Sequence, residues 1–505
     1  MMASALLQLK DIRKSFGSRV LFTGVDFTIH AGEHVGVIGP NGAGKTTLFD
    51  ILLERQEKDE GTITCSRALH IAYLAQHDDF SETETTQEYV ARVASVESWE
   101  VSASAHKFGL SPEHLSALMT HLSGGYQMRS KLLALSLQRA TLLLLDEPSN
   151  YLDLDTTLFL ENFLQNFSGA FLLISHDREF LRRTTDHILE IENGEATKFN
   201  GNLDDYFEQK ELLREQIEAH ARNVKARREQ ILQFVERFGA KATKARQAQS
   251  RLKELKKMET IDIKRLPFSA RIRIPTAAPC GRTVVRLEGG VVGYGPETEV
   301  LKHAHFTIER GDHVAIVGAN GRGKTTLLRT IVGELPLLRG ERALGHEVRF
   351  AYFAQHVSEQ LDPGHTVLEA LYRAKDPSIT EQEARDLAGS LLFTKDNVGK
   401  TLRLLSGGER ARVALGCVLL QKTSCLALDE PTNHLDFATT EALQQALQAY
   451  SGTLICISHD RSFVRAIATK ILSLTEDHTV LPYPGTYEDY VWSIQQKLRQ
   501  ELAQS

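Results

Sequence analysis

The sequence has few cysteines, and no two of them stand at the spacing of a metal-binding pair. Five occur in 505 residues, an odd number without a Cys-x-x-Cys pair. Two of them lie in apolar runs that read as buried strands. We therefore expect all five to be reduced core residues rather than disulfides or metal ligands. They are Cys65, Cys280, Cys417, Cys425 and Cys456.

Long hydrophobic runs are missing too. No uninterrupted apolar stretch approaches the roughly 18 to 20 residues that a membrane-spanning helix needs. The opening MMASALLQLKDIRKSF has too short an apolar stretch before its first charges for a secretory signal peptide. The composition, 42% hydrophobic and 25% charged, is that of a globular chain and excludes disorder. We expect a cytoplasmic protein of two or three domains without a membrane partner.

Five short motifs occur twice, in the same order in both halves of the chain. They are GPNGAGKTT (39–47) and GANGRGKTT (318–326), YLAQ (73–76) and YFAQ (352–355), LSGG (122–125 and 405–408), LDEP (145–148 and 428–431), and ISHDR (174–178 and 457–461). The offset is 279 residues for the first two motifs and 283 for the last three. Because a solenoid repeats every few tens of residues, this pattern indicates the tandem duplication of a whole domain.

The segment between the two copies, 207–266, differs from both in composition. Glycine becomes rare, charge is dense, and apolar residues recur at helical spacing. We predict two antiparallel helices joined near 239–241, each roughly 40 to 45 Å long. Residues 1–206 and 267–505 are then the first and second flanking domains.

Each glycine motif follows an apolar strand, at 34–39 or 313–318, and precedes a helical pattern. It fits G-x-x-x-x-G-K-[ST], in which glycines let the backbone approach phosphate oxygens and the helix N-terminus adds free N–H groups. The lysines, Lys45 and Lys324, would reach the β- and γ-phosphates, and the following Thr46 and Thr325 would hold Mg²⁺. The predicted fold class is therefore α/β, with two tandem P-loop nucleotide-binding domains joined by a helical hairpin.

Paired acids follow a second apolar strand in each copy, in TLLLLDEP and SCLALDEP. Ligands of parallel sheets bind at the carboxyl ends of the strands, where these acids would lie. Asp146 and Asp429 can therefore take the metal ion. Glu147 and Glu430, one residue later, can orient and polarise the water that attacks the γ-phosphate.

The LSGG motif opens a helix in each copy and so provides another place where an anion can bind. Each domain already has a phosphate loop for its own nucleotide. We therefore expect the partner of each LSGG motif to lie in the other copy.

These motifs together closely resemble the ATP-binding cassette proteins, whose two nucleotide-binding domains dimerise head to tail. The resemblance implies that Ser123 and Ser406 are signature serines, each closing on ATP held by the opposite loop. One composite site would join Lys45, Asp146, Glu147 and His176 to Ser406. The other would join Lys324, Asp429, Glu430 and His459 to Ser123. A single chain would then contain an intramolecular cassette dimer.

Further roles are implied by the same resemblance. His176 and His459 correspond to the switch histidines that contact the γ-phosphate, and Gln76 and Gln355 to the glutamines that sense Mg²⁺ and water. Phe16 and Tyr294 would stack on adenine. The complete set of implied ATP contacts is Phe16, Gly39, Pro40, Asn41, Gly42, Ala43, Gly44, Lys45, Thr46, Thr47, Ser123, Gly124, Gly125 and Asp146, with Tyr294, Gly318, Ala319, Asn320, Gly321, Arg322, Gly323, Lys324, Thr325, Thr326, Ser406, Gly407, Gly408 and Asp429.

The two copies are not identical at their signatures. Tyr126 follows the first LSGG where Glu409 follows the second. The loop after the paired acids reads SNYLD (149–153) in the first copy and TNHLD (432–436) in the second. The sequence therefore leaves open whether the two ATP sites are equivalent.

Two fused cassettes separated by a charged helical hairpin resemble the ABC-F subfamily in particular, over essentially the whole chain. Its members are ATP-dependent translation factors that enter the tRNA exit site of the ribosome and point the hairpin toward the peptidyl-transferase centre. The segment KATKARQAQSR is similar to the basic part of that hairpin.

The distribution of charge agrees with an RNA partner. Residues 222–257 hold twelve Lys or Arg and three Glu, a net charge of +9 in a chain whose formal net charge is -6. Aromatic residues are few in this stretch, so we expect contacts to phosphates and to RNA shape rather than base stacking. The predicted contacts to ribosomal RNA and tRNA are Arg237, Lys241, Lys244, Arg246 and Arg251.

Three other functions share these motifs. The ATPase subunit of a transporter would have the same nucleotide motifs but no use for a basic hairpin. A DNA-repair or chromosome-structure ATPase would carry zinc-binding cysteine pairs or far longer coiled coils. An ABC-F protein that protects the ribosome from antibiotics cannot be told from a housekeeping factor by sequence, nor can the target state of the ribosome.

Overall fold

In the computed structural model, residues 4–17, 19–74, 80–81, 83–149, 152–238, 272–295, 297–354, 361–393, 397–433 and 435–504 are described. The chain forms two compact units. One consists of Met1–Phe199 with Ala270–Ser505, and so contains both copies of the repeat. The other is Asn200–Ser269.

The first copy is built on a six-stranded sheet in the order β5-β6-β7-β3-β8-β9. The strands are β3 (His34–Ile38), β5 (Ile71–Leu74), β6 (Leu142–Asp146), β7 (Ala170–Ile174), β8 (His187–Glu192) and β9 (Glu195–Asn200). Neighbours from β5 to β8 are parallel. All five residues of β6 and of β7 are buried, because both faces of the parallel sheet are covered and no polar side is left.

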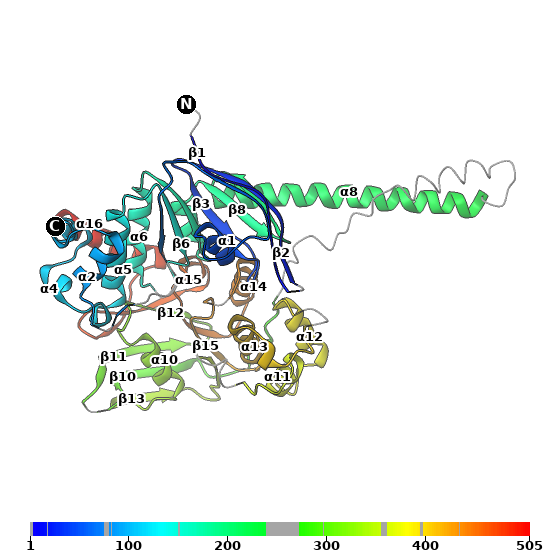
Figure 1. The fold of residues 1–505 in the computed structure, drawn as a ribbon. Helices are drawn as coiled ribbons and strands as arrows, with labels where there is room; N and C mark the ends of the chain where they lie inside the picture. Colours follow the sequence, from blue (N-terminus) through cyan, green and yellow to red (C-terminus); the bar gives the residue numbers. More distant parts are fainter. Residues whose placement is uncertain are drawn as a thin grey trace. The chain divides into compact units, whose positions relative to one another are not determined.

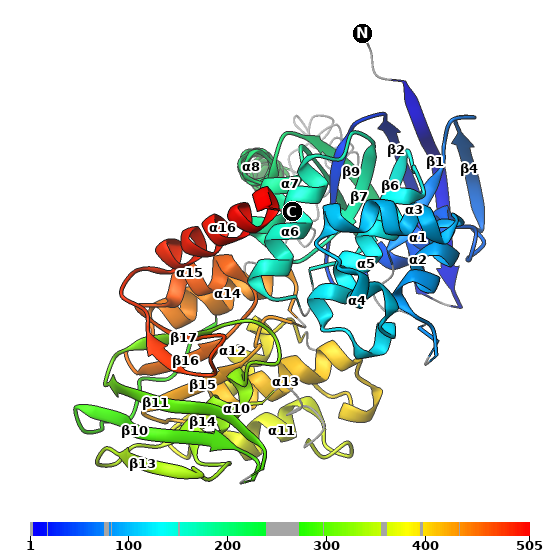
Figure 2. The same cartoon turned by 90° about the vertical axis from the view of Figure 1, so that its left-hand side faces the viewer.

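A smaller antiparallel sheet packs against the first. Its order is β2-β1-β4, with β1 (Ala5–Phe16), β2 (Arg19–His30) and β4 (Glu60–Cys65) (Figure 2). Helix α1 (Lys45–Leu52) lies in the core that joins the two sheets, and its Leu48 and Phe49 are fully buried there. This packing holds the start of α1, and with it the glycine loop, beside the large sheet.

A helical region completes the first copy. Its longer elements are α2 (Thr86–Ala94), α3 (Ser98–Ala105), α5 (Gly124–Leu137), α6 (Leu154–Gln165) and α7 (Arg178–Thr184), with the short α4 (Pro112–Ser116) and the 3₁₀ turns η1 (His106–Phe108) and η2 (Met119–His121) between them. Thr85 begins α2 with a reciprocal cap, since its hydroxyl accepts from the N–H of Glu88 and its own N–H donates to the Glu88 carboxylate.

The second copy repeats this architecture, which confirms the predicted tandem α/β domains. Its large sheet has the order β14-β15-β16-β12-β17-β18 and its small one β11-β10-β13. The strands are β10 (Thr283–Gly293), β11 (Glu299–Glu309), β12 (His313–Val317), β13 (Arg339–Leu344), β14 (Phe350–Phe353), β15 (Cys425–Asp429), β16 (Thr453–Ile457), β17 (Lys470–Leu474) and β18 (Val480–Pro482). The helices are α10 (Lys324–Val332), α11 (Val367–Ala374), α12 (Glu381–Ser390), α13 (Gly407–Leu419), α14 (Phe437–Gln448), α15 (Arg461–Ile467) and α16 (Tyr487–Gln504), with the 3₁₀ turn η5 (Leu402–Leu404).

The cysteines are free, as the sequence predicts, but not all belong to the core. Cys417, Cys425 and Cys456 are buried. Cys65 is exposed, because it ends β4 at the edge of the small sheet, and Cys280 is partly exposed. Among the described residues no cluster of His, Cys, Asp and Glu could hold a metal ion by itself, and none of their helices is long and apolar enough to cross a membrane.

The described part of the second unit contains the long helix α8 (Leu203–Phe238), drawn in green in Figure 1. It begins earlier than predicted because the Asn202 side chain accepts from the N–H groups of Asp204 and Asp205, at 2.8 and 3.1 Å. At 1.5 Å per residue its 36 residues extend about 54 Å, longer than the predicted length. The predicted turn near 239–241 and the second helix lie outside the described residues. So do Lys241, Lys244, Arg246 and Arg251, and the side chain of Arg237.

Candidate active site

The two glycine loops join a central strand of the large sheet to a helix in each copy. Lys45 donates from Nζ to the carbonyls of Gly39 and Pro40, at 2.8 and 3.3 Å. Lys324 makes the equivalent contacts to Gly318 and Ala319, at 2.7 and 3.3 Å. Each ammonium group is therefore held inside the curve of its own loop, where the phosphates of a nucleotide would lie.

Glycine is required at two positions of the first loop. Gly39 has φ 152°, and a Cβ there would lie 2.2 Å from the carbonyl oxygen of Ile191. Gly44 has φ 102°, and a Cβ there would lie 2.8 Å from the ring of Phe22. A larger residue would displace either the neighbouring strand or the core beneath α1, so the loop conformation depends on both glycines.

The paired acids lie at the same edge of the sheet as the glycine loop. Asp146, at the end of β6, is in register with Ile174 of β7, which is paired with Val37 of β3. Asp146 is 1% exposed and accepts a hydrogen bond from the side chain of Thr46, while its Oδ2 atom has no hydrogen-bond partner. Burial raises the pKa of this carboxyl. A hydroxyl beside a carboxylate oxygen with free lone pairs suits a hard cation, so these residues fit Mg²⁺.

The glutamates that follow have an unusual backbone. Glu147 and Glu430 have φ values of 49° and 51°, in the left-handed region that non-glycine residues rarely adopt. In each copy the glutamate N–H donates to the last residue of the neighbouring strand, Ile174 or Ile457, at 2.9 Å. Such a conformation costs on the order of 1–3 kcal/mol and persists only where the surroundings impose it. Both copies share it, which indicates that it directs these carboxyl groups.

Each glutamate faces the predicted switch histidine of its own copy. The Nε2 atom of His176 lies 3.3 Å from Oε1 of Glu147, and that of His459 lies 3.2 Å from Oε1 of Glu430. Burial raises the pKa of Glu147 to about 7 and that of Glu430 to about 8. Burial likewise lowers the pKa of both histidines to about 3, so they are neutral at physiological pH. A carboxyl group that titrates near neutrality beside a neutral imidazole is suited to accept a proton from water.

A cavity of about 590 Å³ opens over the first glycine loop. It is lined by Phe16, Lys45, Asp146, Glu147 and His176 of the first copy and by Ser406 of the second. The structure therefore brings together the residues that the sequence assigns to one composite site, although they are up to 390 positions apart in the chain.

The cavity over the second glycine loop, about 440 Å³, is lined differently. Tyr294, Lys324, Asp429, Glu430 and His459 line it, and all its described lining residues belong to the second copy. Ser123 is not among them. The first copy reaches the second loop through another residue, because the N–H of Asn320 donates to Oδ2 of Asp153 at 3.2 Å. The predicted pairing of Ser123 with this cavity stays a prediction.

The two signature serines also have different surroundings. Ser406 caps α13: its Oγ accepts from the N–H of Glu409 at 3.3 Å, and its own N–H donates to the Glu409 carboxylate at 2.8 Å. Ser123 makes no side-chain cap at the start of α5. The residue in the place of Glu409 is Tyr126, whose ring instead stacks on His114 with 3.9 Å between centroids. The sequence difference at this position therefore changes the geometry of the signature.

The predicted adenine-stacking residues both lie at the rim of their cavities. Phe16 is 48% exposed and Tyr294 is 61% exposed, so each ring has a free face. Tyr294 also approaches the glycine loop, with its hydroxyl 3.3 Å from Oγ1 of Thr326. Gln76 and Gln355 lie outside the described residues.

The sequence analysis missed several residues of the sites, among them two that make polar contacts with the glycine loops. Arg19 lines the first cavity and donates to the carbonyl of Gly42 at 2.8 Å. Asp153 touches the second loop, as described above. Neither belongs to a motif with an evident phosphate chemistry. The signal for Asp153 was that SNYLD follows the paired acids at the same distance as TNHLD does in the second copy, and that both loops end in Leu-Asp.

Comparison with known proteins places the same segments in one family. The profile of a family described as ABC transporter matches residues 22–150 and 301–433. A second profile, also described as ABC transporter, matches residues 189–273. The first covers the glycine loop, the signature and the paired acids of each copy.

Curated relatives match along most of the chain. The probable ATP-binding protein YheS of Escherichia coli K12 is 34% identical over 94% of this chain and 79% of its own. ABC transporter F family member 5 of Arabidopsis thaliana is 33% identical over 97% of this chain and 77% of its own. A crystal structure of the archaeal ribosome recycling factor aABCE1 with the ribosomal stalk protein aP1 contains a similar fold, with a TM-score of 0.66, 19% identity and coverage of 96% of this chain and 92% of that one.

Proposed function

Because the chain belongs to the ABC-F family of ATP-binding cassette proteins and is an ATPase, we propose that it is a translation factor that acts on the ribosome. The observation that carries this proposal is the net charge of +9 over residues 222–257, in a chain with a net charge of -6. A basic segment between two ATPase domains offers an RNA-binding surface whose position ATP can control. A similar fold occurs in aABCE1, which is described as an archaeal ribosome recycling factor. The ribosome is also the partner that we propose here.

Hydrolysis in the first site is assigned to the residues that line its cavity. Lys45 binds the β- and γ-phosphates and Ser406 contacts the γ-phosphate from the second copy. Thr46 and Asp146 would hold Mg²⁺, whose charge offsets that of the phosphates. Glu147 accepts a proton from the attacking water, and its pKa near 7 suits it to this task. In the second site, Lys324, Thr325, Asp429, Glu430 and His459 have the corresponding roles.

Binding of ATP across the interface draws the cassettes together, and hydrolysis releases them. We propose that the closed form enters the tRNA exit site and that the hairpin, through Arg237 and the basic residues beyond it, acts on the peptidyl-transferase region. The hairpin contributes by charge and shape, since phosphate contacts position a protein on RNA without reading its sequence.

Co-sedimentation with ribosomes tests this function directly. The purified chain should pellet with ribosomes in the presence of ATP, and less in ADP or without nucleotide, because only ATP would connect the glycine loop of one copy to the signature serine of the other through its γ-phosphate. Equal recovery in the three conditions would contradict nucleotide control. Absence from the ribosome pellet in all of them, together with recovery in a membrane fraction, would favour a transporter subunit.

Replacing Lys241, Lys244, Arg246 and Arg251 with glutamine should weaken ribosome binding and abolish the effect on translation. Each phosphate contact contributes about 0.7 to 0.9 to the log–log slope of affinity against salt in model nucleic acids, so the slope should also become flatter. Basal ATP turnover should persist, because none of the four residues belongs to a nucleotide motif.

A matched variant separates local contact from net charge. Replacing four exposed lysines of the cassettes with glutamine removes the same charge outside the hairpin: Lys10, Lys58, Lys302 and Lys422. We expect this control to bind ribosomes with the parent salt dependence. If both variants behave like the parent protein, the basic segment is a spacer and not an RNA contact.

A further inference from the structure

An arginine follows each predicted switch histidine by two positions. The offset of 283 residues equates Arg178, after His176, with Arg461, after His459. The same offset equates Glu161 of α6 with Gln444 of α14, and Leu158 of α6 with Glu441 of α14. The acids that could pair with the two arginines are therefore at different positions in the two copies.

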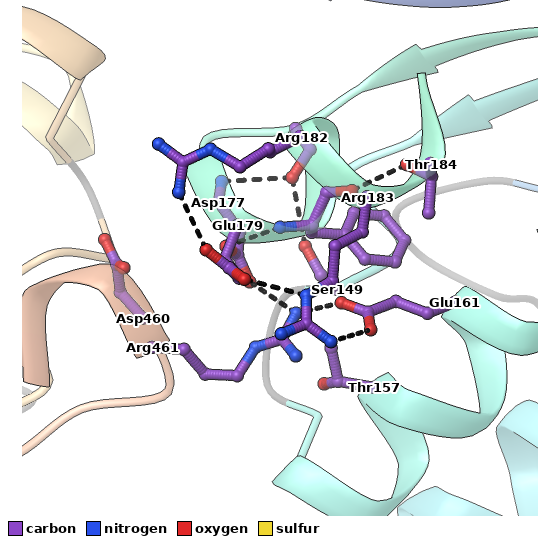
Figure 3. Close-up of polar contacts among 12 residues, drawn as sticks. Ser149, Thr157, Glu161, Asp177, Glu179, Arg182, Arg183, Thr184, Asp460 and Arg461 are labelled. Carbon is purple, nitrogen blue, oxygen red and sulfur yellow. Dashed lines mark hydrogen bonds and ion pairs between the residues drawn. The ribbon is translucent and has the colours of Figure 1, made fainter. Parts of the chain in front are cut away.

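Arg461 is buried across the interface between the copies. It is 2% exposed, and its Nη2 donates to Oε1 of Glu161, which is 3% exposed and belongs to the first copy. The same nitrogen lies 4.0 Å from Oδ2 of Asp177, the residue that follows the first switch histidine. The Nε and Nη1 atoms of Arg461 have no hydrogen-bond partner, so the charge depends on these two carboxylates. Figure 3 shows Arg461 reaching from the second copy to Glu161.

Further contacts surround this pair on the same side of the interface (Figure 3). Arg183 bridges the acids of the first copy, with Nε 2.7 Å from Glu179 and Nη1 3.8 Å from Glu161. Arg465, one turn beyond Arg461 on α15, lies 3.5 Å from Glu179 across the interface. Helix α16 packs against α6, and Leu154 of α6 packs against the core of the second copy. Glu161 is thus held in place from both copies.

The symmetry-related arginine has a more exposed partner. Arg178 donates from Nη2 to Glu441 at 2.9 Å, and the Glu441 side chain is 45% exposed. The Arg178 side chain is 19% exposed and its Nη2 also donates to the carbonyl of Phe437 at 3.4 Å, so this pair is partly buried and open to water on the side of Glu441. A pair open to water contributes less than a fully buried one, in which loss of one partner leaves an uncompensated charge in the interior. The two halves of the interface are therefore joined unequally.

We propose that Arg461 is a positioning residue of the second ATP site, tied through Glu161 to the first copy, and that the pair of Arg178 with Glu441 has no such role. Arg461 begins α15 directly after the loop that carries His459, and it shares a cavity wall with His459 and Lys324. The main chain of His459 in turn donates to Glu430 at 3.1 Å. Movement of Arg461 toward water would therefore displace His459, and with it Glu430, which accepts a hydrogen bond from the main chain of His459.

The test compares Glu161→Gln with Glu441→Gln in the full-length chain. Each of the two variants is made in two backgrounds in which only one site hydrolyses ATP. The Glu147→Gln background leaves the second site to be measured, and the Glu430→Gln background leaves the first. Glutamine is the natural residue at position 444, the counterpart of 161. The inference rests on the two-site assignment proposed above. The assays use purified protein without ribosomes, so a failed role in translation leaves them unaffected.

We expect Glu161→Gln to lower kcat of the second site at least tenfold while KM for ATP changes by less than twofold, because the partners of Glu161 are Arg461 and Arg183 rather than residues of the glycine loop. First-site turnover should stay within twofold, and Glu441→Gln should leave both sites within twofold. A loss at both sites alike would indicate a structural contribution only and overturn the proposal, as would no loss at the second site.

Thermal unfolding measures whether the Glu161→Gln protein is folded. If it is not, a second variant still tests the proposal. Arg461→Lys retains the charge beside Glu161 but offers one nitrogen in place of the guanidinium fork. We expect it to fold and to lower second-site kcat selectively, by a smaller factor. Parent kcat in the folded lysine variant would overturn the proposal. If Glu430→Gln alone failed to reduce turnover, the assignment of the second site would itself be wrong.

Discussion

Replacing Glu147 and Glu430 together with glutamine should lower ATP turnover by about 10²- to 10⁴-fold and leave ATP binding intact, a change of roughly 3 to 5 kcal/mol in barrier height. Both side chains are buried against a histidine, and their backbone conformation aims them into the site. Glutamine keeps the shape but cannot accept the proton of the attacking water. Phosphate release measures the loss, and retention of labelled ATP on the protein measures binding.

The same double variant should accumulate in the ATP-bound form. On the proposed function it should stay on ribosomes and slow protein synthesis, because the cassettes cannot reopen. Glu60→Gln with Glu341→Gln is a suitable control, since both of these acids are exposed and remote from the nucleotide motifs. If the ATP-loaded double variant is absent from the ribosome pellet, the proposed role in translation is wrong. If its ATP turnover is unchanged, the catalytic assignment of the two glutamates is wrong.

Ser406→Arg should abolish turnover in the first ATP site. Ser406 belongs to the second copy but lines the cavity that holds Lys45 and Glu147. An arginine there would fill the space of the γ-phosphate and remove the hydroxyl that caps α13. In a Glu430→Gln background, where the first site alone hydrolyses ATP, we expect phosphate release to fall at least a hundredfold.

Ser123→Arg is the matched control in that background. Ser123 opens the corresponding helix of the first copy, and it does not line the first cavity among the described residues. First-site turnover should therefore remain within about twofold of the background. If Ser406→Arg behaves like Ser123→Arg, the first site is complete within its own copy and the composite arrangement is wrong.

Much of this molecule could be predicted from sequence because the determinants are local. The glycine loops are specified by steric limits at single positions: any side chain at Gly39 or Gly44 would collide with a strand or with the core. The buried strands are continuous apolar runs, and the repeat shows that each is used twice. Tandem α/β domains, the nucleotide loops and the family all follow from such short stretches.

Local sequence signals did not predict three features of the structure: the start of α8, the exposure of Cys65 and the backbone conformation of two glutamates. The start of α8 was placed too late, because a single side-chain cap at Asn202 decides it and the apolar periodicity does not reveal that cap. Cys65 resembles a core residue in composition, but it ends an edge strand and is exposed. The left-handed backbone of Glu147 and Glu430 could not be predicted from the residue type, because glutamate rarely adopts this conformation.

The sequence by itself determined the family and pointed to the candidate residues for binding and hydrolysing ATP, because each motif extends over a few positions of the chain. Only the tertiary structure decided how alike the two sites are and how firmly the copies are joined. Ser406 lines the first cavity while Ser123 does not line the second, and Arg461 meets a buried acid where Arg178 meets an exposed one. These contacts bring together residues about 260 to 390 positions apart, and no periodicity or spacing encodes such pairings. They arise from the packing of two folded domains, in which a change from Glu161 to Gln444 between equivalent positions is enough to make the two sides of the interface unequal.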